Sequence, residues 1–220
     1  MEFTDVVARR RSIRAYEAQP VPPEIIERVF SLGLKAPSNC NTQPWYVHIV
    51  SGATIESLRH TLPEKFMAGQ LQLDYPYDGV YQGEFKVRQY AAAQALYDSL
   101  GIEREDKAKR HEAFMRNFTF FDAPHVAFFY LPAEFGLREA CDLGMFAQTV
   151  MLGLVNEGLG SCPQTALGFH AGTIKQALNI PDDRKLMFGL SFGYPKVGEP
   201  VNECLTDRAK FSDLVTLHEG

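Results

Sequence analysis

The segment 137–157 restricts the fold more than any other part of the chain, because the helix that it predicts is apolar on nearly all sides. One stripe of this helix holds residues spaced by three or four positions, namely Cys141, Met145, Gln148, Leu152 and Val155. Apolar atoms on the other sides come from Phe146, Val150, Gly153 and Leu154. A helix that is apolar all round is buried. We therefore expect it to lie inside a domain or in an interface between subunits.

Around this helix, the sequence predicts more helices than strands. Strand-like runs at 46–50, 125–131 and 185–192 are far apart in the chain. Helical patterns occupy 3–8, 22–36, 53–60, 85–100, 104–117 and 171–179. Because strands and helices do not alternate regularly, an α+β fold is expected rather than a doubly wound parallel sheet. The chain has 220 residues, of which 45% are hydrophobic, so residues 1–220 suit one domain with a sizeable core.

Two segments are expected to lie outside that core. Residues 62–83 are rich in Pro, Gly, Asp and Tyr, and the two helices that follow carry many charges. We interpret 62–122 as a peripheral excursion. Residues 193–220 begin with prolines and glycines and show no helical period. They predict an extended C-terminal tail on a partner subunit, where the apolar run 214–217 would add a strand to the partner's sheet.

A cluster of arginines at residues 9–14 stands out, because the chain as a whole carries a net charge of −5. The overall charge argues against a nucleic-acid partner, whereas a local positive site suits a small anion. If the segment is extended, Arg10, Ser12 and Arg14 point to the same side. Arg208 in the tail would be a fourth cation if the tail folds back. The alternative is a solvated basic patch, or arginines paired with surface acids.

Two further segments carry groups that suit a heteroaromatic ligand. Ser38, Asn39, Asn41 and Gln43 offer donors and acceptors that match the edge of a flavin ring, although such residues are also common in turns. In the run 158–166, Gly160 permits unusual backbone angles, and Pro163 leaves the N–H groups of Gln164, Thr165 and Ala166 free to point at a ligand. A plain turn from helix to strand is the alternative.

Several other classes of site lack their signals. The six histidines form no metal-binding pattern, and there is no Walker A loop, nucleophile elbow or dinucleotide fingerprint. The four cysteines predict free thiols in a reduced, cytoplasmic setting, with Cys40 either reactive or a bystander. No signal peptide and no membrane span are predicted. Phe118, Phe120 and Phe121 suggest either an aromatic substrate pocket or ordinary core packing.

Five motifs together resemble the FMN-dependent nitroreductase family. They are RRRSIRAY at 9–16, PVPPEIIERV at 20–29, APSNCNTQPWYVHIV at 36–50, GLGSCPQTA at 158–166 and FGYPKVG at 192–198. Their order matches the family over most of the chain. The segment 100–124 is similar to the branch that reduces nitrobenzoates and dinitroaromatics. The resemblance implies a central mixed or antiparallel sheet flanked by helices, and an intertwined homodimer with exchanged tails and two FMN sites at its interface.

The resemblance also implies the roles of individual residues. One subunit would contact the FMN phosphate and ribityl chain through Arg10, Arg11, Ser12, Arg14 and Arg208. The partner subunit would contribute Pro37, Ser38, Asn39, Asn41 and Gln43. The ring would be flanked by Gln164, Thr165 and Ala166, with the Thr165 N–H near N5. Many family members carry Glu-Gly where this chain has Thr165-Ala166, so only the backbone donor is retained here. A wall for the substrate is predicted from Tyr81, Phe118, Phe120 and Phe121.

By the same resemblance, NADPH or NADH would pass a hydride to flavin N5. A nitroaromatic compound, or a quinone, would then be reduced on the same face in a ping-pong cycle, with no side chain acting as nucleophile or base. Two alternatives remain. One is a flavoenzyme of the same fold with other chemistry, such as dehalogenation or flavin fragmentation. The other is a flavin- or phosphate-binding module without turnover.

Overall fold

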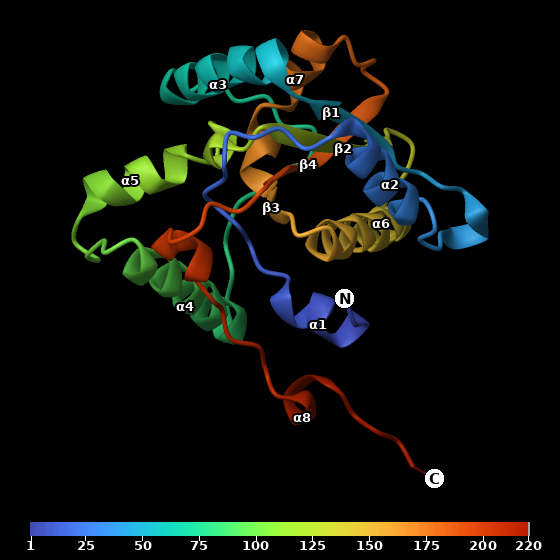
Figure 1. Cartoon of the computed structure of the whole chain (residues 1–220), viewed down its shortest axis with the longest axis vertical. Coiled ribbons are helices and arrows are strands. Elements are labelled where there is room, and N and C mark those ends of the chain that lie inside the picture. The colour runs from blue at the N-terminus through green and yellow to red at the C-terminus, as the bar shows by residue number, and fades with distance from the viewer. Residues whose placement is uncertain (220) are drawn as a thin grey trace.

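A four-stranded sheet forms the centre of the computed structural model, which describes residues 1–219 (Figure 1). Its strands are β1 (Tyr46–Val50), β2 (His125–Pro132), β3 (Gly160–Gln164) and β4 (Arg184–Gly193). They lie in the order β1-β2-β4-β3, and every neighbouring pair is antiparallel. This arrangement confirms the α+β class, and the sheet is antiparallel rather than mixed.

The predicted helices are all present, with ends shifted by a few residues. They are α1 (Phe3–Arg9), α2 (Pro23–Gly33), α3 (Gly52–Met67), α4 (Gly83–Ser99), α5 (Lys107–Met115), α6 (Leu137–Asn156) and α7 (Ala171–Leu178). A short α8 (Phe211–Leu214) follows in the tail. The largest shift is in α3, which was expected to end at His60 but continues through Pro63. Burial of Ile55, Leu58 and Leu62 outweighs the one hydrogen bond that this proline removes.

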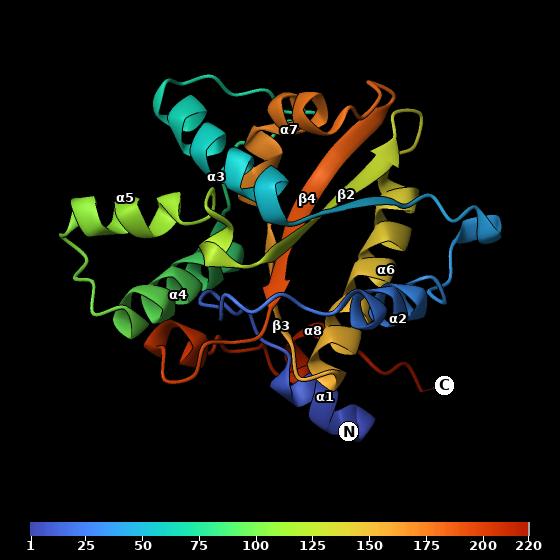
Figure 2. The same ribbon diagram turned by 45° about the horizontal axis from the view of Figure 1, so that its top comes forward.

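The sheet separates two cores because alternate side chains of β2 point to opposite faces. Ala127, Phe129 and Leu131 pack with Phe146 and other residues of α2 and α6. On the other face, residues 126, 128 and 130 pack with α3 and α7. Figure 2 shows these two helix pairs on opposite sides of the sheet. All eight residues of β2 are buried, as expected for a central strand.

Strand β3 is not among the strands predicted from the sequence, where residues 158–166 are expected either to face a ligand or to form a plain turn from helix to strand. Its sequence GSCPQ contains a glycine and a proline, both of which disfavour a strand assignment. The strand forms nevertheless because it lies at the edge of the sheet, next to β4. There Pro163 need not donate a hydrogen bond to a second neighbouring strand.

Helix α6 is not buried on all sides within this chain. One face is buried through Leu143, Phe146, Val150 and Leu154, which pack toward α2 and the sheet. On the other face Cys141 and Gly144 are exposed, and Met145 retains 40% of its surface. The sequence alone predicts burial of this helix either in a domain core or in a subunit interface. In the structure, one face of α6 packs in the core of its own chain, and the opposite face is exposed to solvent.

Fewer residues of the peripheral excursion and of the C-terminal tail lie outside the core than the sequence predicts. Leu62 in α3 and Phe118 and Phe120 near η2 (Phe120–Asp122) are fully buried, so the peripheral part is essentially α4, α5 and their connections. Residues 194–203 pack on their own chain, ending in the short helix η4 (Pro200–Glu203), where Val201 and Asn202 are buried. From Leu205 onward the described tail is exposed. Within residues 1–219, no helix combines the length and hydropathy that crossing a membrane requires.

Candidate functional site

The arginine segment lies along the free edge of β3. The Ile13 N–H donates to the carbonyl of Ser161 over 3.0 Å, and Ser12 forms a parallel bridge with Ser161. The approach is close at Gly160, where a Cβ atom would lie only 2.5 Å from Ile13 Cγ1. Ile13 is buried, so the extended backbone directs its neighbours Ser12 and Arg14 away from the core.

Asn202 fixes the backbone of the same segment from the other side. Its Oδ1 accepts the N–H groups of Arg14 and Ala15 over 2.8 and 3.0 Å, and its Nδ2 donates to the Ala15 carbonyl over 2.8 Å. Asn202 is itself only 3% exposed. A buried amide that satisfies three backbone groups makes the arginine segment a rigid platform.

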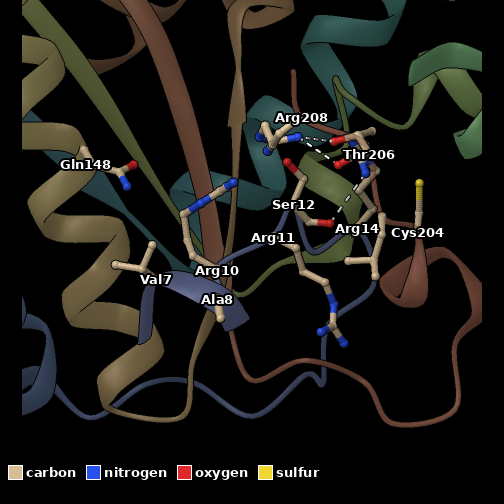
Figure 3. A pocket seen from close by; sticks show the side chains of 11 residues that line it. Val7, Ala8, Arg10, Arg11, Ser12, Arg14, Gln148, Cys204, Thr206 and Arg208 are labelled. Atoms are coloured by element: carbon tan, nitrogen blue, oxygen red, sulfur yellow. Dashed lines mark hydrogen bonds between the residues drawn. The ribbon is translucent and has the colours of Figure 1, made fainter. Parts of the chain in front are cut away.

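The side chains on this platform surround a cavity of about 490 Å³ (Figure 3). Arg10, Ser12, Arg14 and Arg208 line it, together with Val7, Ala8, Arg11, Gln148, Cys204, Leu205 and Thr206. Arg208 is oriented by its own neighbours, because its Nη1 donates to the hydroxyl of Thr206 over 2.8 Å. The structure thus brings together the four residues that the sequence analysis grouped as an anion site.

Three arginines of the cavity have no acidic partner within residues 1–219. Burial, and then the nearby positive charge of Arg208, lower the pKa of the Arg10 guanidinium. Arg10, Arg14 and Arg208 take part in none of the ion pairs formed within residues 1–219. Crowding of like charges is unfavourable, and an anion bound between them would relieve it.

Arg11 points away from the other arginines (Figure 3). Its Nε donates to the carbonyl of Asn202 over 2.6 Å, and its Nη2 lies 3.2 Å from the Glu203 carboxylate. The guanidinium therefore has an acid partner of its own, although the residue still borders the cavity. Cys162 is completely buried behind the segment, and this burial raises the pKa of its thiol, so a reactive thiolate is disfavoured there.

The amide loop lies elsewhere in the same subunit. None of Pro37, Ser38, Asn39, Asn41 and Gln43 lines the arginine cavity. In Figures 1 and 2 their segment follows α2 and lies at the right edge of the molecule, away from α1. The loop is largely exposed, but a hydrogen bond within it holds its backbone: the Gln43 N–H donates to the Ser38 hydroxyl over 3.0 Å. One subunit by itself does not unite the two halves of the predicted site.

The third predicted element has one buried and two accessible members. Gln164 is 2% exposed, and its side-chain amide is used internally. Its Nε2 donates to the Asn117 carbonyl over 2.8 Å, and its Oε1 accepts the hydroxyl of Ser191. Thr165 is exposed and Ala166 half-buried. Thr165 also borders a small hollow of about 110 Å³ that is lined by Tyr77 and Phe169.

The predicted substrate wall needs a correction. Phe118 and Phe120 have no exposed surface and belong to the core on the α3 and α7 side of the sheet, which is the core-packing alternative. Phe121 is 4% exposed and lines a hollow of about 170 Å³ that also includes Arg14 and Pro163. Tyr81 is 46% exposed and precedes α4. Only Phe121 and Tyr81 of the predicted wall can meet a ligand in this chain.

Comparison with known proteins assigns the chain to a family. Residues 7–194 match the family model described as "Nitroreductase family". The chain belongs to the nitroreductase family. This match covers the arginine segment, the amide loop and β3, and it ends where β4 gives way to the tail.

Named relatives of this nitroreductase match it over nearly their whole length. Nitroreductase NfnB of Mycolicibacterium smegmatis is 37% identical over 94% of this chain and 89% of its own. A 4-nitrobenzoate reductase of Pseudomonas putida is 30% identical over 91% and 88%. A crystal structure of the FMN-dependent NfnB from Mycobacterium smegmatis in complex with NADPH superposes with a TM-score of 0.93, at 35% identity, over 99% of this chain and 100% of that one.

Several residues of the cavity in this nitroreductase escaped the sequence analysis. Gln148 was seen only as part of a helix stripe, and Thr206 and Cys204 only as part of an extended tail. Asn202 lies in a region without any periodic pattern, and nothing nearby marked it as the clamp of a segment 188 residues away. The one signal nearby is Arg208, six residues later, which is expected to join the arginines if the tail folds back.

Proposed function

We propose that this protein is an FMN-dependent oxidoreductase that uses NADPH or NADH to reduce nitroaromatic compounds. The observation that carries the proposal is the cavity lined by Arg10, Ser12, Arg14 and Arg208 in a chain of net charge −5. Membership of the nitroreductase family supports it, as do the names of the relatives, which include an FMN-dependent nitroreductase bound to NADPH and a 4-nitrobenzoate reductase.

The residues around the cavity suit the phosphate of FMN. Three guanidiniums and a hydroxyl offer donors to a dianion, and guanidinium forks match phosphate oxygens in a bidentate manner. Hydrogen bonds to a charged group contribute roughly 1.5–3 kcal/mol each, so three of them would anchor the phosphate firmly. The cavity of about 490 Å³ also leaves room for part of the ribityl chain.

The remaining parts of the site would come from two subunits. In one subunit, the accessible backbone at Thr165 and Ala166 follows β3 and would lie beside the flavin ring. The loop 37–43 does not line the cavity of its own chain, and it would cover the ring of the flavin in the partner subunit. The open face of α6 is suited to the interface of such a homodimer, because Gln148 on that face also lines the cavity.

The protein would act mainly by binding and orientation. When bound, the flavin supplies hydride transfer between the reduced nicotinamide and the nitro compound. The arginines would hold the phosphate end, and the Thr165 backbone N–H would donate toward the reactive edge of the ring. Phe121 and Tyr81 would offer apolar surface to an aromatic substrate. No acid–base side chain is assigned a role.

The proposal is tested first by colour and turnover. Purified protein should show flavin absorbance, anaerobic NADPH should bleach it, and 4-nitrobenzoate should restore the colour. A protein that stays colourless after reconstitution with FMN would refute the proposal. Bleaching that no nitroaromatic compound reverses would instead favour other flavin chemistry.

The phosphate site is tested by removing single arginines and comparing FMN affinity by fluorescence quenching. Arg10→Ala and Arg14→Ala should each weaken FMN binding about tenfold or more, as the loss of one charged hydrogen bond predicts. Arg11→Ala is the matched control, since its guanidinium already pairs with Glu203. Equal losses in all three variants would mean that general positive charge, rather than this cavity, holds the phosphate.

A further inference from the structure

A second basic hollow lies between the end of α4 and the beginning of α5. Its volume is about 250 Å³, and its walls are Tyr90, Ala93, Gln94, Tyr97, Arg104 and Arg110. None of these residues lines the arginine cavity described above. In Figures 1 and 2 the loop that joins α4 to α5 lies at the left edge of the molecule, on the side opposite the amide loop.

Neither arginine of this hollow has an acidic partner. Arg104 and Arg110 take part in none of the ion pairs found in the described residues 1–219. Arg110 is held in place, because its guanidinium lies 5.0 Å from the ring centre of Tyr97 and its Nη1 donates to the Arg104 carbonyl over 2.9 Å. Its Nε is buried without a partner in the described chain. A buried donor of this kind is costly unless an acceptor arrives.

The acids near the hollow do not neutralise it. Asp98 accepts the side-chain amide of Gln94 over 2.6 Å. Asp106 caps α5 by accepting the Lys109 N–H over 3.0 Å, and it pairs with the Lys109 ammonium. The side chains of residues 103 and 105 adjoin Arg104 in sequence, but neither lines the hollow. The hollow therefore keeps two guanidiniums available for an external anion.

The composition of the walls narrows the class of ligand. Two guanidiniums match the oxygens of a phosphate monoester, which carries up to two negative charges. The Tyr97 ring packs against the Arg110 guanidinium. Tyr90 is 60% exposed, and its ring adds an aromatic surface on which a heteroaromatic base could stack, although Lys86 lies over one of its faces. Tyr97 also lines the neighbouring hollow of Phe121, Pro163 and Arg14. A long ligand could therefore reach the second basic hollow from the region beside β3.

We propose that Arg104 and Arg110, with Tyr90 and Tyr97, bind the adenosine 2′-phosphate end of NADPH. This assignment rests on the proposed function, and it deepens that function by selecting between the two nicotinamide donors. NADH lacks the 2′-phosphate and would leave both guanidiniums without an anion. The protein should therefore prefer NADPH.

The test separates this hollow from flavin chemistry. FMN-loaded protein is titrated calorimetrically with adenosine 2′,5′-bisphosphate and with adenosine 5′-monophosphate, since bound FMN keeps the arginine cavity filled. Arg104→Gln should weaken binding of the bisphosphate about ten- to a hundredfold, as the loss of a charged hydrogen bond predicts, and leave the monophosphate unchanged. Arg110→Gln should do the same. The exposed Arg138 on α6 provides the control, Arg138→Gln, which should bind both probes as the unmodified protein does.

The same variants are then bleached anaerobically with NADPH and with NADH. The proposal expects the NADPH concentration for half-maximal bleaching to rise and the NADH value to stay constant. The proposal would be overturned if this concentration rose equally for NADPH and NADH, or if it rose for neither. It would also be overturned if Arg104→Gln weakened binding of 4-nitrobenzoate alone, because the hollow would then hold an aryl carboxylate. If neither donor bleaches the unmodified protein, the proposed function fails, while the nucleotide titration still reports on the hollow.

Discussion

The imidazole of His170 is fully buried between aromatic rings. Its ring centre lies 5.0 Å from that of Phe118 and 6.2 Å from that of Phe66. Neither ring nitrogen has a hydrogen-bond partner in the described residues. Burial, with a smaller contribution from the charge of Lys65, lowers the pKa of His170 from 6.5 to about 4. The folded protein therefore holds this histidine neutral.

This pKa predicts a loss of stability in acid. Between about pH 6.5 and 4, His170 is protonated in the unfolded chain but remains neutral in the folded chain. The free energy of unfolding therefore falls as the pH falls through this range. The full effect is about 3 kcal/mol, at 1.36 kcal/mol per pKa unit. His170→Phe, which suits the aromatic surroundings, should flatten this part of the profile.

Urea unfolding between pH 4.5 and 8 measures this effect as the difference between the two proteins. His60→Gln serves as the control, because His60 is exposed on α3. If His170→Phe lost stability in acid as steeply as the unmodified protein, the carboxylates would account for the profile and His170 would not.

At the scale of elements, the amide loop depends on α6. Asp142 is 4% exposed on that helix, and its Oδ2 accepts the Asn39 N–H over 3.0 Å. Three residues of the loop have positive φ angles although none is glycine, with 50° at Cys40, 57° at Asn41 and 48° at Gln43. Such backbone angles carry strain and persist only where the surroundings impose them. The buried carboxylate is one of those constraints.

Removing this constraint should weaken FMN binding. Asp142→Ala loses the acceptor for the Asn39 N–H, and the expected cost is about 1–3 kcal/mol. If the loop covers the partner's flavin, FMN release on dilution should accelerate, as followed by the recovery of flavin fluorescence. Asp142→Asn keeps an acceptor oxygen, so its rate of FMN release should lie between those of the unmodified protein and Asp142→Ala. If Asp142→Ala lowered the melting temperature but left the rate of FMN release unchanged, the loop would not be part of the cofactor site.

At the scale of the whole molecule, large apolar side chains lie exposed along the C-terminal tail and on the open face of α6, and exposed apolar patches mark interaction surfaces. The described tail carries five large apolar residues that are each at least 46% exposed, namely Leu205, Phe211, Leu214, Val215 and Leu217. Met145 on the open face of α6 adds to this surface. An extended tail cannot bury these side chains on itself, and a second copy of the chain would cover them.

We therefore expect a homodimer that the tail stabilises. The triple variant Phe211→Ala, Leu214→Ala and Leu217→Ala should raise the dimer dissociation constant strongly, since fully burying each such side chain is worth about 1.5–3 kcal/mol. Sedimentation across a dilution series measures this constant. Lys210→Ala, a polar change in the same tail, should leave it unaltered. A dimer that persists in the triple variant would assign the interface to α6 alone.

Much of the architecture was predictable because its signals are local. Helical periodicity located α2, α6 and α7, and continuous apolar runs located β1, β2 and β4. Strand β3 was missed because Gly160 and Pro163 read locally as a turn. Its pairing with β4 depends on contacts some 30 residues away, with Gly160 opposite Gly193. The core placement of Phe118 and Phe120 depends in the same way on helices from distant parts of the chain.

The sequence by itself determined the family, the α+β class and the chemistry of the anion site, since motifs and periodicity reside in neighbouring residues. Only the tertiary structure decided which side chains share that site. It turned Arg11 toward Glu203, introduced Asn202 as a clamp, and gathered Arg104 and Arg110 around a second hollow. These placements depend on chain folding over long separations, where the packing of distant elements outweighs local preference.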